Sequence, residues 1–260
     1  MRANIARLDL RLRRRSLTWY AVGMVLYTLL VVVLYPSFKH QTTLNSLSGS
    51  TAAALLGITG KLTSPDGWLN ANIYGNFFPL IMLLLTIGYG AAALAGQDED
   101  GTLTLVAALP IRRSAILLQK AGAMALQALL LGVAVAICVV VGRGFQLSTS
   151  PADTAAVTVA LVLMGLDFGL ITMAAGVVTG RRGAALGVGA GLAAASYVLS
   201  SLASTISSIR PGRYFSLFYW SVGNNQLSRG VSAMDFAALL GVGLIVLVAA
   251  VAVFRRADLN

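Results

Sequence analysis

Charged side chains are scarce in this sequence of 260 residues. They make up 11% of the chain, 57% of it is hydrophobic, and the mean hydropathy is +0.82. A soluble domain carries about 25% charged residues, so the deficit excludes a soluble globular protein and indicates a chain embedded in lipid. The apolar runs are continuous rather than short and alternating, which excludes a β-barrel and favours helices of about 20 residues. We therefore predict an all-α integral membrane protein.

Residues that catalyse reactions or bind metals are also scarce. The one cysteine, Cys138, cannot form an intrachain disulfide, and the one histidine, His40, is expected in an outer loop. A Ser–His pair within the membrane is therefore excluded. Asp167 is the one carboxylate in the middle of a predicted span, which excludes a two-aspartate site. No group of His, Cys, Asp and Glu has the spacing of a metal site, so we expect neither an enzyme nor a metal centre.

A phosphate-binding loop is missing as well. The pair Gly60-Lys61 faintly resembles one, but the working pattern needs a glycine five residues before that pair and Ser or Thr after it. Those positions hold Leu55 and Leu62. The chain is therefore expected to bind no nucleotide cofactor of its own, and any ATP hydrolysis belongs to another polypeptide.

Six apolar runs are present, and we treat residues 1–260 as a single transmembrane domain. The runs predict helices at about residues 17–35, 73–95, 114–141, 153–178, 184–207 and 234–254. Residues 1–16 combine arginines with Ile5, Leu8 and Leu12 at helical spacing, which predicts an amphipathic helix on the cytoplasmic face. Two interpretations of that helix are open: an elbow that touches a motor domain, or a topology anchor.

The net charge of +10 would suggest nucleic acid as a partner of a soluble protein. In a membrane protein it reflects Lys and Arg on the cytoplasmic side. Six spans place both termini on one side, and most basic residues near span ends fall there. We therefore expect cytoplasmic termini, a lipid bilayer as the surroundings, and no nucleic acid partner.

Asp167 is the most unusual polar residue of the predicted spans. A charge at the centre of a membrane helix costs about 2.5–3.5 kcal/mol on insertion scales, so this side chain should face a cavity or a partner, or remain protonated. Its functional interpretations are a substrate-pathway residue or a proton relay. The alternative is a hydrogen bond between packed helices.

Small residues and aromatic residues suggest two packing features. Gly183, Gly187 and Gly191 recur every four residues, a pattern that lets membrane helices approach closely, either at a dimer interface or, as we expect by default, within one subunit. Residues 209–233 contain aromatic side chains beside arginines. They predict a re-entrant hairpin or an interfacial aromatic belt.

The stretch from Gln97 to Arg113 is the most distinctive loop. It begins with three acids and Gly101, continues with a leucine-rich amphipathic turn, and ends with Pro110 and a basic pair. A compact charged loop on the cytoplasmic side is a natural place for a soluble partner to push. This loop, followed by Lys120, resembles the segment between spans two and three of ABC-2 type permeases.

The resemblance extends to the end of the chain. In the loop the directly matching residues are Glu99, Gly101, Thr102, Leu109, Pro110, Arg113 and Lys120. Residues 213–220 and 254–259 resemble the closing pattern of the family, with two departures. Ala257 intervenes between Arg256 and Asp258, and Leu217 stands where a proline is frequent.

The resemblance implies the permease subunit of a bacterial export-type ABC transporter in the plasma membrane, multi-pass with cytoplasmic termini. The partners would be a second permease half, identical or related, and two ATP-binding subunits that bind ATP and magnesium. Thr102–Leu109 would be a coupling helix, and residues 1–16 a connecting helix with Arg7, Arg11 and Arg14. The implied ATPase-coupling residues are Asp98, Glu99, Asp100, Gly101, Thr102, Leu103, Leu105, Val106, Leu109 and Arg113.

The expected substrate is a hydrophobic or amphipathic compound such as a drug or antibiotic, because the spans are apolar and carry few charges. A rival hypothesis is a self-sufficient channel or proton-coupled carrier that uses Asp167.

Overall fold

A computed structural model describes residues 5–41, 61–101 and 112–256, and this part of the chain is helical without strands. Six helical segments are long and apolar enough to cross a membrane: Asp9–Phe38, Pro65–Glu99, Ser114–Phe145, Pro151–Thr179, Arg182–Ala203 and Ala233–Phe254. The protein is therefore an all-α integral membrane protein, as the sequence predicted.

The six segments contain helices α1 (Ile5–Phe38), α3 (Pro65–Leu69), α4 (Phe78–Ala91), α5 (Gln97–Glu99), α7 (Arg113–Val141), α8 (Pro151–Thr179), α9 (Arg182–Thr205) and α12 (Ala233–Arg256). Shorter elements are the π-helices η2 (Asn70–Phe77) and η3 (Ala92–Gly96), the 3₁₀ helices η4 (Gly142–Phe145) and η5 (Ser207–Phe215), and helices α10 (Leu217–Ser221) and α11 (Gln226–Arg229).

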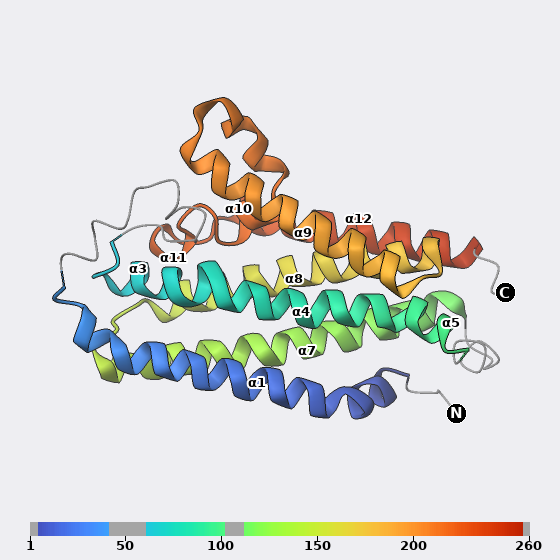
Figure 1. Cartoon of the computed structure of the whole chain (residues 1–260), viewed down its shortest axis with the longest axis horizontal. Coiled ribbons are helices and arrows are strands. Elements are labelled where there is room, and N and C mark those ends of the chain that lie inside the picture. The colour runs from blue at the N-terminus through green and yellow to red at the C-terminus, as the bar shows by residue number, and fades with distance from the viewer. Residues whose placement is uncertain (1–4, 42–60, 102–111, 257–260) are drawn as a thin grey trace.

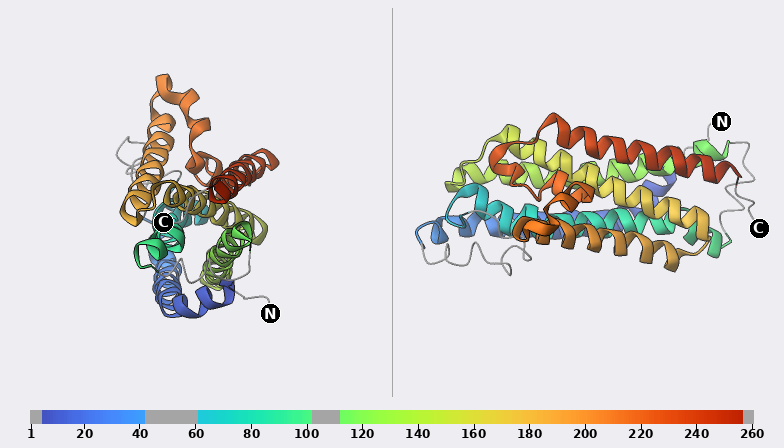
Figure 2. Two further views of the ribbon diagram at one scale, coloured as in Figure 1. Left: turned by 90° about the vertical axis from the view of Figure 1, so that its right-hand side faces the viewer. Right: turned by 90° about the horizontal axis from the view of Figure 1, so that it is seen from above.

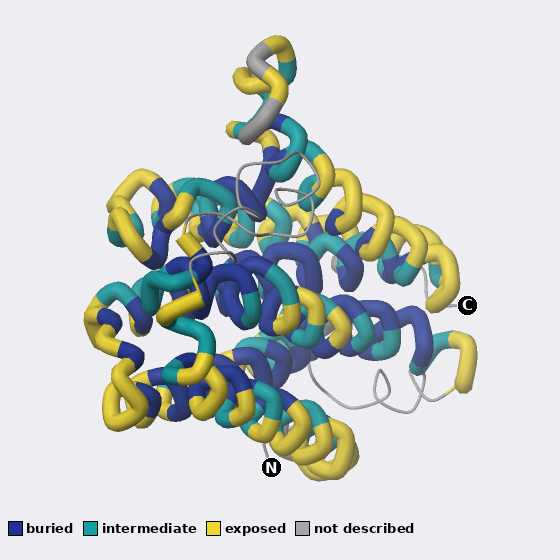
Figure 3. The backbone as a smooth tube through the Cα atoms, turned by 60° about the vertical axis from the view of Figure 1, so that its left-hand side comes forward, coloured by how far each residue is buried: buried dark blue, intermediate teal, exposed yellow. Residues whose placement is uncertain are grey.

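The long helices run side by side, and the chain passes back and forth along one axis (Figures 1 and 2). Both ends of the described chain and α5 lie at the same end of the bundle, which we call the inner end. Helix α8 is central, because it packs against α4, α7, α9 and α12. Figure 3 shows the consequence: residues in the middle of the bundle are buried, and many residues on the surrounding helices are exposed.

Local signals define the ends of α8. Ser150 caps its first turn by accepting a hydrogen bond from the Asp153 N–H at 3.4 Å, and Pro151 occupies the first turn, where its missing N–H costs nothing. Gly180 ends the helix in the left-handed conformation, with φ of 60°, which favours glycine. The turn that follows places the start of α9 at the inner end.

Helices α4 and α8 approach closely at Gly90. A Cβ atom there would collide with the carbonyl oxygen of Gly169 and lie 3.2 Å from the backbone nitrogen of Met173. Backbone atoms cannot move aside without shifting a helix. Glycine at this position therefore fixes how near α4 lies to the central helix.

We expect Gly90→Ala to destabilise the protein by about 1–3 kcal/mol, because overpacking forces backbone shifts. Thermal unfolding in detergent measures the change. Gly88→Ala is the matched control in the same helix, since an added Cβ at Gly88 meets no described atom within 4 Å. Equal stability of the two variants would contradict the close approach.

The second membrane segment is one helical run from Pro65 to Glu99, interrupted by two π-helical stretches. It is longer than the expected 73–95 because Ser64 caps its start and Pro65 follows directly. Trp68 donates a hydrogen bond from Nε1 to the Val31 carbonyl oxygen at 3.0 Å, which ties this end to α1. Single-turn π segments often occur at functional sites.

The N-terminal amphipathic stretch and span one form one helix. Helix α1 runs from Ile5 to Phe38 without an end near residue 16, and it includes Pro36, where we expected the span to stop. Because α1 is about 50 Å long at 1.5 Å per residue, and the hydrocarbon core is about 30 Å thick, its first turns extend beyond that core.

The segment before α12 combines features of both predicted alternatives. Elements η5 and α10 lie between α9 and α12, and η5 is the part farthest from the bundle (Figure 1). Phe215 of η5 is 89% exposed, as in an interfacial belt, whereas Phe218 and Ser221 of α10 are buried. The Ser221 hydroxyl donates to the Met164 sulfur of α8 at 3.0 Å, so α10 folds back onto the bundle.

The glycine stripe of α9 faces outward. Added Cβ atoms at Gly183, Gly187 and Gly191 would meet no described atom within 4 Å. Our default prediction of packing within the subunit is therefore wrong for these three glycines. Gly189, on the opposite face, packs against α8 and α4, where an added Cβ would collide with Thr172.

Candidate functional site

The acidic run lies at the inner end, directly after the second π-helix. Asp98 and Glu99 belong to the short helix α5, and Glu99, Asp100 and Gly101 are exposed. The Gly101 N–H donates to the Asp98 carbonyl oxygen at 3.0 Å, and Gly101 has φ of 66°. A left-handed residue at this turn favours glycine. The turn presents the acids at the surface of the bundle.

Glu99 joins this turn to the start of α9. The backbone N–H of Arg182 donates to Glu99 Oε1 at 3.0 Å. The first N–H groups of a helix have no partners within it and carry partial positive charge, and the residue before α9, Arg181, supplies no side-chain cap. Glu99 therefore caps α9 from a position 83 residues earlier in the chain.

A buried polar cluster, which we call the inner cluster, lies behind the acidic turn. It comprises Asp9 of α1, Tyr89 of α4, Gln97 of α5 and Lys120 of α7. The Tyr89 hydroxyl donates to Asp9 Oδ2 at 2.7 Å, and Lys120 Nζ lies 3.4 Å from the same oxygen. Lys120 also donates to Gln97 Oε1 at 2.8 Å. The first, second and third membrane segments therefore meet through hydrogen bonds at the inner end.

Three members of the inner cluster, Asp9, Tyr89 and Lys120, are buried, and Gln97 is half-buried. Lys120 is 0% exposed and Asp9 is 7% exposed. The guanidinium carbon of Arg13 lies 4.7 Å from the centre of the Tyr89 ring, a cation–π contact that covers one side. From the sequence, Lys120 was singled out only by the resemblance to the family loop, and Asp9 was given no role. One signal was available: Asp9 is an isolated acid in a strongly basic stretch, four residues before Arg13.

The structure describes only some of the other residues predicted to couple to the ATPase. Arg11 and Arg14 are exposed on α1, on the part of the helix that carries Asp9. Several residues lie outside the described part of the chain, or their side chains do: Arg7, Thr102, Leu103, Leu105, Val106, Leu109 and Arg113. The expected coupling helix, Thr102–Leu109, therefore stays a prediction.

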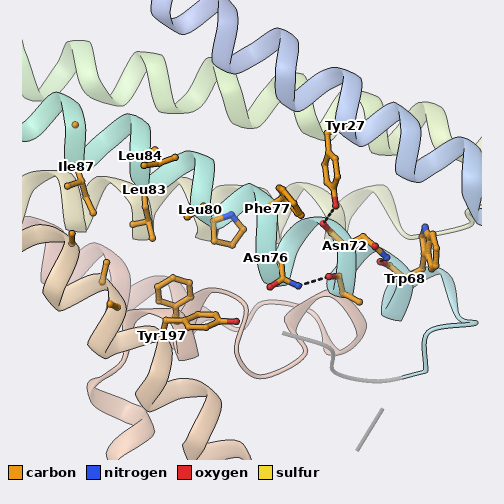
Figure 4. Close-up of a pocket in the computed structure, with 18 of the residues that line it drawn as sticks. Tyr27, Trp68, Asn72, Asn76, Phe77, Leu80, Leu83, Leu84, Ile87 and Tyr197 are labelled. Atoms are coloured by element: carbon orange, nitrogen blue, oxygen red, sulfur yellow. Dashed lines mark hydrogen bonds between the residues drawn. The ribbon is translucent and has the colours of Figure 1, made fainter. Parts of the chain in front are cut away.

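A groove of about 1020 Å³ lies between the second and fifth membrane segments. Its walls come from η2 and α4 on one side and α9 on the other, with Tyr27 of α1 at its edge (Figure 4). No charged side chain is among the described residues that line it, and most are Leu, Ala or aromatic. The space suits a largely apolar molecule.

Amide groups lie at the end of the groove away from α5. Asn76 donates from Nδ2 to the Ala71 carbonyl oxygen at 2.7 Å, and the Tyr27 hydroxyl donates to the Asn72 carbonyl oxygen at 3.0 Å. Toward the inner end the walls converge. There an added Cβ at Gly189 of α9 would lie 3.2 Å from Ile87 of α4.

Asp167 belongs to neither of these sites. It is buried at 2% exposure in α8, and its Oδ2 atom has no hydrogen-bond partner among the described residues. It faces α12 at Gly243, where an added Cβ would lie 2.5 Å from Asp167 Oδ1. The groove is lined by other residues. A role for Asp167 in a substrate pathway stays a prediction.

Comparison with models of known protein families finds a match that covers nearly the whole chain. Residues 3–259 match the model of a family described as ABC-2 family transporter protein. No curated protein matches the sequence.

Proposed function

The chain belongs to the ABC-2 transporter family, and we propose that it is the permease half of an ATP-driven exporter. Members of this family are membrane-spanning, generally non-catalytic components that associate with ABC ATPase subunits. As a member, it is a multi-pass membrane permease of an ABC transporter. We propose that the inner end is cytoplasmic, in a bacterial plasma membrane. Two separate ATP-binding subunits would bind ATP and magnesium there.

The capping of α9 by Glu99 is the observation that supports this proposal most strongly. The second and fifth membrane segments form the groove walls, and the Glu99–Arg182 hydrogen bond joins them at the inner end. A partner that pushes on the acidic turn would strain this exposed bond, move α4 relative to α9 and change the width of the groove. ATP would bind one state of the assembly more tightly than the other, and this difference in affinity would shift the equilibrium between them.

The groove is our candidate for part of the substrate pathway. It is apolar and uncharged in its described lining, with amides at its outer end. These features support a hydrophobic or amphipathic substrate such as a drug or antibiotic, because a charged molecule would lose hydration without gaining partners.

Co-purification tests the proposed function directly. The tagged chain, extracted in mild detergent, should retain an ABC ATPase, and the purified complex should hydrolyse ATP. We expect a neighbouring reading frame to encode that ATPase. Purification of the chain alone, with no ATPase bound in the membrane or in detergent, would refute the proposal.

We propose that the second permease half packs against the outward glycine face of α9. Gly187→Leu should reduce cross-linking of paired permease chains at least tenfold while leaving insertion and thermal unfolding unchanged, because no described atom lies near this glycine. Gly241→Leu on α12 is the matched control, since Gly241 is equally open. Equal cross-linking of the two variants would place the partner elsewhere.

The unpartnered Oδ2 of Asp167 favours a second candidate function, a self-sufficient channel or proton-coupled carrier. This candidate predicts that the purified chain alone transports in proteoliposomes and that Asp167→Asn removes the pH dependence of transport. The exporter hypothesis predicts instead that Asp167→Asn keeps ATP-dependent transport within about threefold of the original. Measurement of ethidium efflux at pH 6 and pH 8, with and without the ATPase, separates the two.

A further inference from the structure

The inner cluster and the Glu99–Arg182 contact differ sharply in strength. The cluster joins α1, α4, α5 and α7 through a buried ion pair and two further hydrogen bonds. Separating buried charges leaves each without hydration or a partner, which is very costly. By contrast, the bond from the Arg182 N–H to Glu99 is exposed, and water can replace either partner at low cost.

Gln97 links the two contacts. Its side-chain oxygen accepts from Lys120 inside the cluster, and it begins α5, which carries Glu99 two residues later. A force applied to the acidic turn therefore reaches Lys120 and Asp9 through one short helical turn. The same force meets the start of α9 at the exposed hydrogen bond between Glu99 and the Arg182 N–H.

We propose that Asp9, Tyr89, Gln97 and Lys120 are positioning residues that lock the start of α1, the inner end of the second segment and the start of α7 into one body. This body moves as a unit when the acidic turn is pushed, and it slips against α9 at Glu99. The inference rests on the proposed function, because it assigns the moving parts of that same permease.

The N-terminal stretch continues into span one as a single helix, so Asp9 and the arginines near it belong to one rigid element. Arg11 and Arg14 are exposed on α1 within one turn or two of Asp9. The cluster therefore fixes these arginines relative to the acidic turn. A soluble partner that contacts both surfaces meets one rigid platform rather than two independent segments.

Distances between spin labels test the proposal in the complete complex with its ATPase, reconstituted in lipid. Leu12 and Leu118, both exposed, report on the interior of the proposed body. Leu118 and Val188, which is exposed on α9 beside the glycine stripe, report across the slip plane. Each pair is converted to cysteine in a chain that carries Cys138→Ala, and double electron–electron resonance is recorded without nucleotide and after vanadate trapping with ATP.

We expect the Leu12–Leu118 distance distribution to stay the same and the Leu118–Val188 distribution to shift on trapping. A shift within the body, or none across the slip plane while other label pairs respond, overturns the inference and leaves the proposed function intact. If no pair responds to nucleotide although the ATPase is bound, both the inference and the proposed function fail.

Two substitutions in the labelled chain test the role of Asp9 directly. In the labelled chain, Asp9→Asn should make the Leu12–Leu118 distribution broaden and respond to nucleotide. Asp235→Asn is the matched control, because Asp235 is also buried and paired, with Arg229 at 2.8 Å on the outer side. The same broadening in both variants would show general loosening and would overturn the proposed role of Asp9. If Asp9→Asn fails to insert, the distances in the chain with native Asp9 still decide the question.

Discussion

Lys120→Met should be the most destabilising single substitution at the inner end. It leaves the Asp9 carboxylate buried with Tyr89 as its remaining described hydrogen-bond donor. Removing one partner of a buried ion pair costs about 3–5 kcal/mol. At about 2–4 °C per kcal/mol, thermal unfolding in detergent should begin roughly 10 °C lower.

A double variant separates the ion pair from simple packing. Asp9→Leu combined with Lys120→Met removes both buried charges, and such replacements are often neutral or stabilising. We therefore expect the double variant to recover most of the lost stability. Arg229→Met is the comparison, because its ion pair is partly exposed and Asp235 keeps a hydrogen bond from the Ser232 N–H at 2.9 Å. It should cost only about 1 kcal/mol. Failure of the double variant to recover would show that the cluster stabilises through shape alone.

The sequence predicted the membrane segments well because their signal is local. A run of apolar residues long enough to span lipid can be recognised from the sequence alone, and each of the six predicted runs corresponds to a helical segment of the structure. Boundaries were less accurate where a cap or a continuous helix extended a segment, as at Ser64 and in α1. These extensions depend on polar residues that hydropathy alone treats as loop.

The inner cluster was missed because its members are far apart in the chain. Lys120 and Asp9 are separated by 111 positions, and each alone resembles an ordinary charge at a membrane surface. The same holds for Glu99, whose partner is a backbone N–H that no side-chain pattern can indicate. Contacts of this kind require knowledge of which helices are neighbours.

The glycines of α9 show a related limit. Gly187 and Gly189 are two positions apart, so they point to opposite sides of the helix, one open and one packed. The spacing of small residues predicted a close approach but not which face provides it. The structure shows that the packed face uses Gly189, whereas the regular four-residue stripe is left open to lipid or a partner.

Glu99→Gln should reduce transport at least tenfold while leaving the protein folded and bound to its ATPase. The carboxylate of Glu99 caps α9 through a charge-assisted bond to the Arg182 N–H, and such bonds are roughly twice as strong as neutral ones. An amide keeps the shape but weakens the attraction to the positive helix terminus. Since the contact is exposed, we expect a loss of stability of at most about 1 kcal/mol.

The expected result is uncoupling: ethidium efflux should fall at least tenfold while ATP hydrolysis stays within about twofold, because the bond that aligns the acidic turn with α9 before each push is weakened. Gly101→Ala should act in the same direction, since Gly101 has φ of 66° and a side chain there strains the turn. Asp153→Asn is the control, because this half-exposed acid lies in the first turn of α8 and is not part of the acidic turn. Efflux that survives in Glu99→Gln would mean that movement of the second and fifth segments does not depend on this hydrogen bond. Other residues would then couple the acidic turn to α9.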